Sequence, residues 1–187
     1  MLSKRARGVA KKSERRQWVV DQIMATLTDD RIFATLDYRR RSESYLKQYM
    51  HQPLEARMIT ICRKLFPGVS DRTVERKAKL SLFWEGDVKT TVNNIRFLGV
   101  QHRPDFVVKV DDIRVAVEVK RGENGSAVRE GLGQSLVYSS CENFDFVVYL
   151  FVDTSSDKKV RDSLKRGLDS AFIQSLWEER NIRFAIV

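Results

Sequence analysis

The sequence predicts an α/β protein in which a central mixed sheet is flanked by helices, and three observations support this class. Residues 105–120 alternate apolar side chains with a period of two, which is typical of strands. Val128, Leu132 and Leu136 recur at four-residue intervals, as they do in an amphipathic helix. Residues 144–152 form a nearly continuous apolar run, which is typical of a strand buried on both faces.

The segment 105–120 is predicted to be a β-hairpin with one apolar face. The alternating apolar positions run along both arms: Phe106, Val108, Val110, Ile113, Val115, Val117 and Val119. A two-residue turn at Asp111 and Asp112 places Asp105 directly opposite Glu118. A four-residue loop keeps that register, whereas a loop of three or five residues would change it. With the apolar face buried, the two acids share the other face.

Two carboxylates in this arrangement favour a bound metal ion. Directly opposed residues have Cβ atoms about 5 Å apart, and two anions that close are unfavourable without a cation between them. Lys120 lies two residues after Glu118 on the same face, with Arg103 across from it. The hairpin therefore predicts a divalent metal held by Asp105 and Glu118, with a lysine beside it.

These positions, Pro104-Asp105 and Glu118-Val119-Lys120, resemble the signature of the PD-(D/E)XK nuclease superfamily. The resemblance implies a restriction-endonuclease-like αβββαβ core and metal-dependent hydrolysis of phosphodiester bonds in DNA. It also implies that Asp105, Glu118 and the backbone carbonyl of Val119 hold Mg²⁺ or Mn²⁺, which prefer hard oxygen ligands. Lys120 would orient the attacking water and neutralise the scissile phosphate. The resemblance leaves open whether cleavage is endo- or exonucleolytic.

The helix after the hairpin carries a further motif. Gln134 and Tyr138 are four residues apart, and this Gln-x-x-x-Tyr resembles a motif of the RecB-like branch of the superfamily. The resemblance implies that both residues position the substrate strand, and we expect Arg103 and Arg121 to contact the substrate as well. The alternative is that Tyr138 is a core aromatic residue and Gln134 a surface residue.

The same helix is predicted to begin near residues 124–126, where an asparagine, a glycine and a serine form a typical helix entry. Gly131 and Gly133 each cost about 1 kcal/mol relative to alanine inside a helix. Close approach of the helix to the sheet or to a phosphate backbone would account for that cost.

A helix upstream of the hairpin is expected to supply a further acid. Pro53 suits the first turn of a helix that runs to about Phe66. The resemblance implies that the first helix of the core contributes an acid to the site, and Glu55 is our candidate because it lies at the edge of the buried stripe. Three other glutamates compete with it: Glu43, Glu75 and Glu85. The alternative for each is a solvated glutamate.

The chain is predicted to consist of a basic tail and helical extension over residues 1–52 and a nuclease-like domain over residues 53–187. In the extension, helices are expected from Ser13 to about Leu27 and over residues 39–50. The second of these begins with three consecutive arginines near tyrosines, which would suit either a nucleic-acid strand or an ordinary exposed face.

Three further segments complete the predicted order. Residues 71–92 are ambiguous, because 73–84 fit a helix or, from residue 79, a strand. Asn93 and Asn94 are expected to turn the chain into a strand over residues 95–100. After the buried strand, residues 157–180 are predicted to be a helix, and residues 182–187 to be a final strand.

Charge favours a polyanionic partner. The net charge is +9 and the sequence pI is about 9.7, and residues 1–16 hold seven basic residues against one acid. This tail would contact phosphates without sequence preference, or it would be a solvated arm. DNA is therefore the expected partner, and a homodimer or a larger nucleoprotein assembly stays open.

Cysteine content and hydropathy narrow the setting. Cys62 and Cys141 are the two cysteines of the sequence, too few for a four-thiolate iron-sulfur cluster or a cysteine zinc site. No apolar run has the length of a membrane span, and the start lacks a secretory signal. The sequence therefore predicts a cytoplasmic protein with reduced thiols and no membrane partner.

Three other functions compete with a metal-dependent nuclease. A catalytically inactive protein with the nuclease fold would bind nucleic acid or assemble with other proteins, but it would gain nothing from opposed buried acids. A small DNA-binding regulator would use the N-terminal helices, which lack helix-turn-helix spacing. A histidine-based nuclease would use His102 with His51, but His102 is predicted to be a loop residue.

Overall fold

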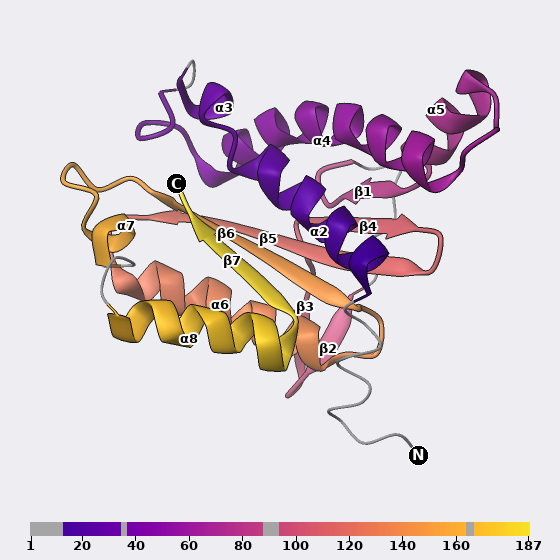
Figure 1. Ribbon diagram of the computed structural model, residues 1–187. Coiled ribbons are helices and arrows are strands. Elements are labelled where there is room, and N and C mark those ends of the chain that lie inside the picture. Colours follow the sequence, from indigo (N-terminus) through magenta and orange to yellow (C-terminus); the bar gives the residue numbers. More distant parts are fainter. Residues whose placement is uncertain (1–12, 35–36, 88–93, 164–166) are drawn as a thin grey trace.

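A computed structural model describes residues 13–34, 37–87, 94–163 and 167–187 (Figure 1). The described helices are α2 (Glu14–Leu27), α3 (Asp30–Ala34), α4 (Glu43–Leu65), α5 (Asp71–Lys79), α6 (Gly125–Ser140), α7 (Lys159–Ser163) and α8 (Gly167–Arg180). The described strands are β1 (Leu82–Trp84), β2 (Ile95–Phe97), β3 (Val100–His102), β4 (Phe106–Val110), β5 (Ile113–Gly122), β6 (Phe146–Asp153) and β7 (Ile182–Ile186).

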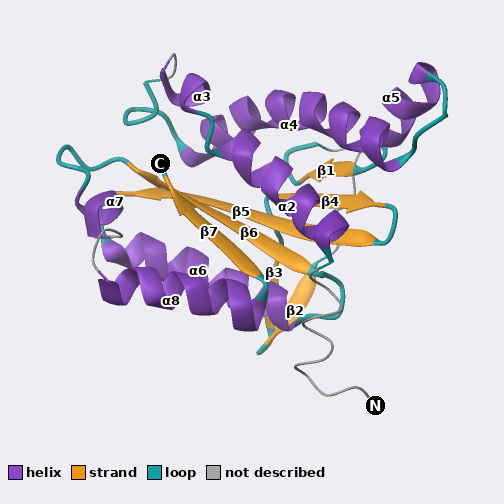
Figure 2. Ribbon diagram, viewed as in Figure 1, coloured by secondary structure: helices purple, strands orange, loops and turns teal. Residues whose placement is uncertain are grey.

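Within the described residues, five strands form one mixed sheet in the order β1-β4-β5-β6-β7. Strands β1, β4 and β5 pair antiparallel, whereas β5, β6 and β7 pair in parallel. Helices α2 and α4 cover one face of the sheet, and α6 and α8 cover the other (Figure 2). The α/β class and the mixed sheet flanked by helices are confirmed.

The hairpin of β4 and β5 has the predicted register. Phe106 pairs with Val117, and the pairing continues to Val110 opposite Ile113. The turn holds two residues, and the first of them, Asp111, has φ of 52°, a left-handed conformation that aspartate tolerates better than most residues. The two-residue turn is confirmed, and it sets which side chains share a face.

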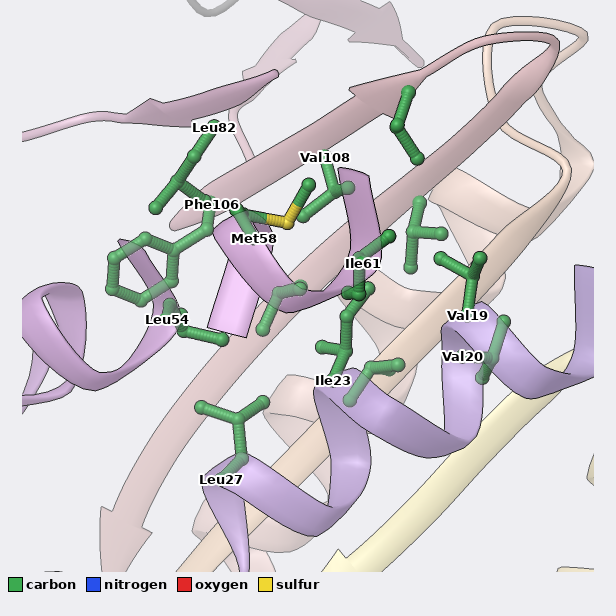
Figure 3. Packing of buried hydrophobic residues seen from close by; sticks show 14 of the residues in the cluster. Val19, Val20, Ile23, Leu27, Leu54, Met58, Ile61, Leu82, Phe106 and Val108 are labelled. Carbon is green, nitrogen blue, oxygen red and sulfur yellow. The ribbon is translucent and has the colours of Figure 1, made fainter. Parts of the chain in front are cut away.

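The apolar face of the hairpin is buried against the helices that precede it in the chain. Figure 3 shows side chains of α2 and α4 directed at those of β1 and β4, with Ile23 and Met58 near the centre of the contact. All seven predicted apolar positions of the hairpin are buried. Burial of this face leaves the other face of the hairpin for the two acids.

Helix α4 departs from the prediction, because it is continuous through Pro53. Two helices were expected, one over residues 39–50 and one from Pro53. A proline inside a helix removes one hydrogen bond and costs about 3 kcal/mol. Buried apolar side chains on both sides of it, among them Met50 and Leu54, hold the helix against the sheet and offset that cost.

The predicted division between residues 52 and 53 therefore falls inside a helix. Val19 and Ile23 of the expected extension are fully buried in the same cluster as Val108 of the sheet. The helical extension and the expected nuclease-like domain share one hydrophobic core.

Helix α6 begins as predicted but buries a different face. The Asn124 side chain accepts a hydrogen bond from the backbone N–H of Ser126, as an N-cap does. The expected stripe at Val128, Leu132 and Leu136 is only partly covered, and Leu136 is 37% exposed. The buried positions of this helix are Gly131, Ser135 and Tyr138.

Gly131 accounts for that choice of face. A Cβ atom at this position would lie 2.6 Å from the ring of Tyr149, so only glycine allows α6 to approach β6 this closely. Close approach to the sheet is therefore confirmed for Gly131. It is not the reason for Gly133, where a Cβ atom would meet nothing within 4 Å.

The remaining segments resolve the ambiguities of the sequence. Residues 71–92 contain both a helix, α5, and a strand, β1. Strands β2 and β3 form a separate two-stranded hairpin among the described residues, so residues 95–100 do not join the main sheet. His102 was expected in a loop, but it is the last residue of β3. The C-terminal helical stretch consists of α7 and α8, separated by residues outside the described ranges. Asn93 and the basic tail through residue 12 also lie outside them.

Candidate active site

The hairpin places Asp105 and Glu118 inside the protein. Asp105 immediately precedes β4 and is 2% exposed, and Glu118 lies within β5 and is 1% exposed. Asp105 Oδ2 accepts a hydrogen bond of 2.7 Å from the backbone N–H of Val119. Glu118 Oε2 accepts one of 3.3 Å from the hydroxyl of Tyr138 in α6. Both acids are therefore held by short contacts at one place in the sheet.

Lys120 lies beside these acids. Its Nζ atom is 3.5 Å from Glu118 Oε1 and 3.4 Å from Glu130 Oε1 of α6. It is also 3.7 Å from Glu43 Oε1, at the start of α4. Lys120 thus links β5 to helices on both faces of the sheet.

A second lysine, which sequence analysis missed, occupies the same cluster. Lys47 Nζ lies 2.5 Å from Asp105 Oδ1, 2.9 Å from Glu43 Oε1 and 3.4 Å from Glu85 Oε1. Its side chain is only 11% exposed. Glu85 follows β1, and its backbone N–H donates to the carbonyl of Asp105, which keeps this acid next to the site.

One sequence signal points to Lys47. It lies between the buried residues Leu46 and Met50 on α4, so a charge interrupts an apolar helix face. Such a charge requires a partner, and Glu43 stands one helical turn earlier. What the sequence does not reveal is that the helix delivers this pair to the hairpin.

The upstream acid in the cluster is Glu43, not Glu55. The Glu55 side chain is 49% exposed, and its nearest charged partner among the described residues is His51 at 3.8 Å. Glu75 is exposed on α5, whereas Glu85 reaches the cluster through Lys47. The helix begins ten residues earlier than expected, and its first turn lies over the end of β5. Glu55, about three turns later, is carried past the site.

The cluster holds more acids than bases. Among the described residues, five carboxyl groups surround two ammonium groups: Asp105, Glu118, Glu43, Glu85 and Glu130 around Lys47 and Lys120. Burial raises the pKa of Asp105 to about 7, against the opposing effect of Lys47. Burial and the charge of Asp105 raise the pKa of Glu118 to about 8. These shifts indicate that burial disfavours the charged forms of both acids more than the two lysines favour them.

The pKa values of the two lysines are raised as well, for a different reason. Burial alone would lower the pKa of Lys47, but Asp105 and Glu43 outweigh it and raise that pKa. Burial would likewise lower the pKa of Lys120, and Glu118 and Glu43 raise it. Both lysines are therefore cations at neutral pH and act as donors and counter-charges, not as bases.

The raised acid pKa values predict that the metal-free protein loses stability with rising pH. The folded protein holds these protons more tightly than the unfolded chain, so the contribution is full below the ordinary values of 3.8 and 4.5. It is lost as pH rises through about 7 and about 8. Each group changes the free energy of unfolding by about 1.4 kcal/mol per pH unit between its two pKa values.

Urea unfolding in a chelator at several pH values measures this slope. Asp105→Asn and Glu118→Gln should each remove the contribution of one carboxyl group to the slope of unfolding free energy against pH. Acids with lowered pKa values, such as Asp153, change the free energy of unfolding only below about pH 4. They therefore do not affect the slope between about pH 5 and pH 8. A wild-type stability that stays level or rises through neutral pH would contradict the raised pKa values.

The two predicted residues of α6 have different surroundings. Tyr138 is fully buried, and its hydroxyl donates to Glu118, so it does not face a substrate strand. Burial raises the pKa of Tyr138, followed by the charge of Glu118, so the hydroxyl stays a proton donor. Gln134 is half-buried, and its Oε1 atom has no hydrogen-bond partner among the described residues. Tyr138 is therefore a core aromatic residue, as the alternative interpretation expects, and its hydroxyl contacts a proposed site residue.

The two predicted arginines lie at the edges of the cluster. Arg103 is exposed, and its guanidinium donates to the backbone carbonyl of Glu85 at 3.4 Å. Arg121 is half-buried, and its backbone N–H donates to Glu43 Oε2 at 3.4 Å. Its guanidinium donates to the carbonyl of Arg39 at 2.8 Å. Arg121 therefore ties the end of β5 to the segment that enters α4.

That segment carries the three consecutive arginines. Arg39, Arg40 and Arg41 are exposed next to the end of β5, and the Arg41 guanidinium lies 4.7 Å from the ring centroid of Tyr45. Arg40 pairs with the exposed Asp37 at 3.6 Å, and the basic residues Arg15 and Arg16 of α2 pair with Asp111 and Asp112 of the hairpin turn. The arginine triplet forms an exposed basic surface beside the candidate site.

The candidate metal ligands are Asp105, Glu118 and the backbone carbonyl of Val119. Within residues 13–34, 37–87, 94–163 and 167–187, no three His, Cys, Asp or Glu side chains gather as a ready metal site. The two buried acids with a backbone carbonyl suit a hard cation that keeps several waters, as Mg²⁺ does.

Within the described residues, no helix has the length and apolar character needed to cross a membrane.

Comparison with known proteins does not assign the chain to a family. No protein family, curated protein or solved structure matches the chain.

Proposed function

We propose that the protein is a metal-dependent nuclease that hydrolyses phosphodiester bonds in DNA. The observation that carries the proposal is the convergence of Asp105, Glu118 and Lys120 at one end of a rigid hairpin. Two acids buried this deeply are unfavourable for a purely structural hairpin, because burial raises their pKa values and the two lysines compensate their charge only in part. A divalent cation would supply that compensation.

The order of the elements supports the same proposal. Helix α4 is followed by the short helix α5, then by β1, β4 and β5, and then by α6 and the parallel strand β6. This order is similar to the αβββαβ arrangement that the PD-(D/E)XK resemblance implies, with α5 and the β2–β3 hairpin as additions. The proposed motif residues lie on the central antiparallel pair of that arrangement.

In this proposal, Asp105, Glu118 and the carbonyl of Val119 hold Mg²⁺ or Mn²⁺. A cation bound there would lower the pKa of a coordinated water and offset negative charge on the phosphate. Lys120, kept protonated by the acids around it, would orient the water and contact a phosphate oxygen. Tyr138 holds the carboxylate of Glu118 in place through its hydroxyl.

Glu43 is the proposed upstream acid. It accepts from Lys47 and from the backbone of Arg121, and it lies 3.7 Å from Lys120. Its role would be to fix both lysines, so that their charges face the reacting phosphate. Glu55 lies twelve residues later on α4, about 18 Å along the helix axis, which is too far for that role.

The arginine triplet would position the DNA backbone. We expect replacement of Arg39, Arg40 and Arg41 by alanine to weaken DNA binding and to flatten the dependence of log K on log salt. Each lost phosphate contact on duplex DNA changes that slope by about 0.9. Turnover at saturating DNA should change little, because the Arg39 carbonyl that holds Arg121 is backbone.

A charge-matched control tests whether position matters. Alanine at Arg72, Arg76 and Lys79 removes the same charge from α5, which lies near the far end of α4 (Figure 1). The salt slope from fluorescence anisotropy with labelled DNA should fall for the first variant much more than for the second. Equal effects of the two triple variants would contradict a dedicated phosphate contact at the site.

A second candidate is a catalytically inactive protein with the same fold that binds nucleic acid or assembles with other proteins. One observation favours it: Lys47 already satisfies Asp105, and no three acids gather as a ready metal site in the described residues. The nuclease proposal requires that a cation compete successfully with this lysine.

One assay separates the two candidates. Purified protein is incubated with linear duplex, circular duplex and single-stranded DNA, with Mg²⁺, with Mn²⁺ and with chelator, and DNA binding is measured in parallel. Metal-dependent cleavage supports the nuclease, and cleavage of the circle shows endonuclease activity. Tight DNA binding without cleavage under every metal condition would favour the inactive protein.

A further inference from the structure

Each buried acid of the candidate site has its own lysine. Lys47 Nζ contacts Asp105 Oδ1 at 2.5 Å, and Lys120 Nζ contacts Glu118 Oε1 at 3.5 Å. The second oxygen of Asp105 is held by the N–H of Val119. Both oxygens of Asp105 are therefore engaged by the protein itself.

The two lysines differ in how they are held. Lys47 comes from α4 and also contacts Glu43 and Glu85, at 2.9 and 3.4 Å. These acids would keep its ammonium in place after a loss of Asp105, because both belong to segments packed against the hairpin. Lys47 is thus positioned to leave one carboxylate without moving into solvent.

We propose that Lys47 is a built-in counter-ion that the metal replaces on Asp105, an inference that rests on the proposed metal site. In the metal-free protein, Lys47 neutralises a carboxylate that burial would otherwise leave uncompensated, which keeps the site folded. A divalent cation bound at the site would take the place of Lys47 beside Asp105, and Glu43 and Glu85 would retain the ammonium. Lys47 is therefore a positioning residue that sets the metal affinity.

The competition predicts opposite effects for two substitutions. Lys47→Met keeps the length and apolar stem but removes the competing charge, so Mn²⁺ should bind more tightly. Lys47→Arg keeps the charge and adds a planar fork that grips carboxylates with two hydrogen bonds, so Mn²⁺ should bind more weakly. A lysine that merely filled space would give no such reversal.

Isothermal titration of the full chain with MnCl₂ measures these affinities without any assay of activity. We expect the dissociation constant to fall about tenfold in Lys47→Met, the scale of a coupled contact, and to rise several-fold in Lys47→Arg. Lys79→Met, which removes an exposed lysine of α5, should leave it unchanged. Equal affinities of the wild type and Lys47→Met would overturn the proposal.

Stability without metal gives a second readout. Lys47→Met should lower the urea midpoint of the chelated protein, because it strands the charge of Asp105. Adding Asp105→Asn should restore much of the loss, since the stranded charge is then removed. Asp105→Asn should not restore Lys120→Met in the same way, because Lys120 contacts Glu118. Equal recovery of both lysine variants would overturn the assignment of Lys47 to Asp105.

The outcomes separate this inference from the proposed nuclease. Mn²⁺ binding that tightens in Lys47→Met, without cleavage of DNA by the wild type, would support the lysine and reject the nuclease. Cleavage with a metal affinity indifferent to Lys47 would do the reverse. Absence of Mn²⁺ binding in every variant would reject both. If Lys47→Met alone does not fold, its rescue by Asp105→Asn and the affinity of Lys47→Arg decide the question.

Discussion

Asp105→Asn is expected to lower metal-dependent DNA cleavage about a thousandfold, since several kcal/mol of charge stabilisation depend on the metal. DNA binding should be kept or tightened, because the substitution removes a negative charge that repels phosphate. The fold should survive, since an asparagine oxygen can still accept from the N–H of Val119. The change therefore separates chemistry from binding.

Single-turnover cleavage at saturating DNA and anisotropy of labelled DNA measure the two effects side by side. Asp169→Asn, an equal change at an exposed position of α8, should match the wild type in both. If binding and cleavage fall together, the variant has a folding defect or the site has a binding role. If cleavage is unchanged, the proposed mechanism is wrong.

Glu43→Gln should lower turnover about a hundredfold, or about 3 kcal/mol in the barrier, whereas Glu55→Gln should leave it within about twofold. Glu43 accepts from Lys47 and from the Arg121 backbone and lies near Lys120, so its loss leaves both lysines poorly placed. Among the described residues, Glu55 makes a half-exposed contact with His51 at 3.8 Å. Both variants replace a glutamate of α4 by glutamine, so they compare the same chemical change at two positions of one helix.

Initial rates at saturating DNA compare the two variants, and circular dichroism checks that α4 is intact in both. The effect of Glu43→Gln should appear in turnover more than in DNA affinity, since Glu43 acts through the lysines. A large loss in Glu55→Gln with a near-normal Glu43→Gln would show that the acid predicted from the sequence was the functional one after all.

The sequence by itself determined the hairpin and the acids on it. Strand periodicity is local, so the alternation along residues 105–120 sufficed to place Asp105 and Glu118 on one face once a two-residue turn was assumed. The start of α6 at Asn124 was equally local, because capping involves only neighbouring residues. The buried run of β6 followed from composition.

Only the tertiary structure decided which side chains surround those acids. Whether α4 presents Glu43 or Glu55 depends on where the helix begins and how it lies on the sheet, and burial of apolar residues on both sides of Pro53 settled this against the local signal. The same packing carried Lys47 to Asp105. On α6, the stripe with the clearest periodicity stayed partly exposed, because Gly131 allows closer contact with Tyr149 and turns Tyr138 inward. Side-chain periodicity defines faces within an element, but the contacts between elements are chosen by packing of residues far apart in the chain.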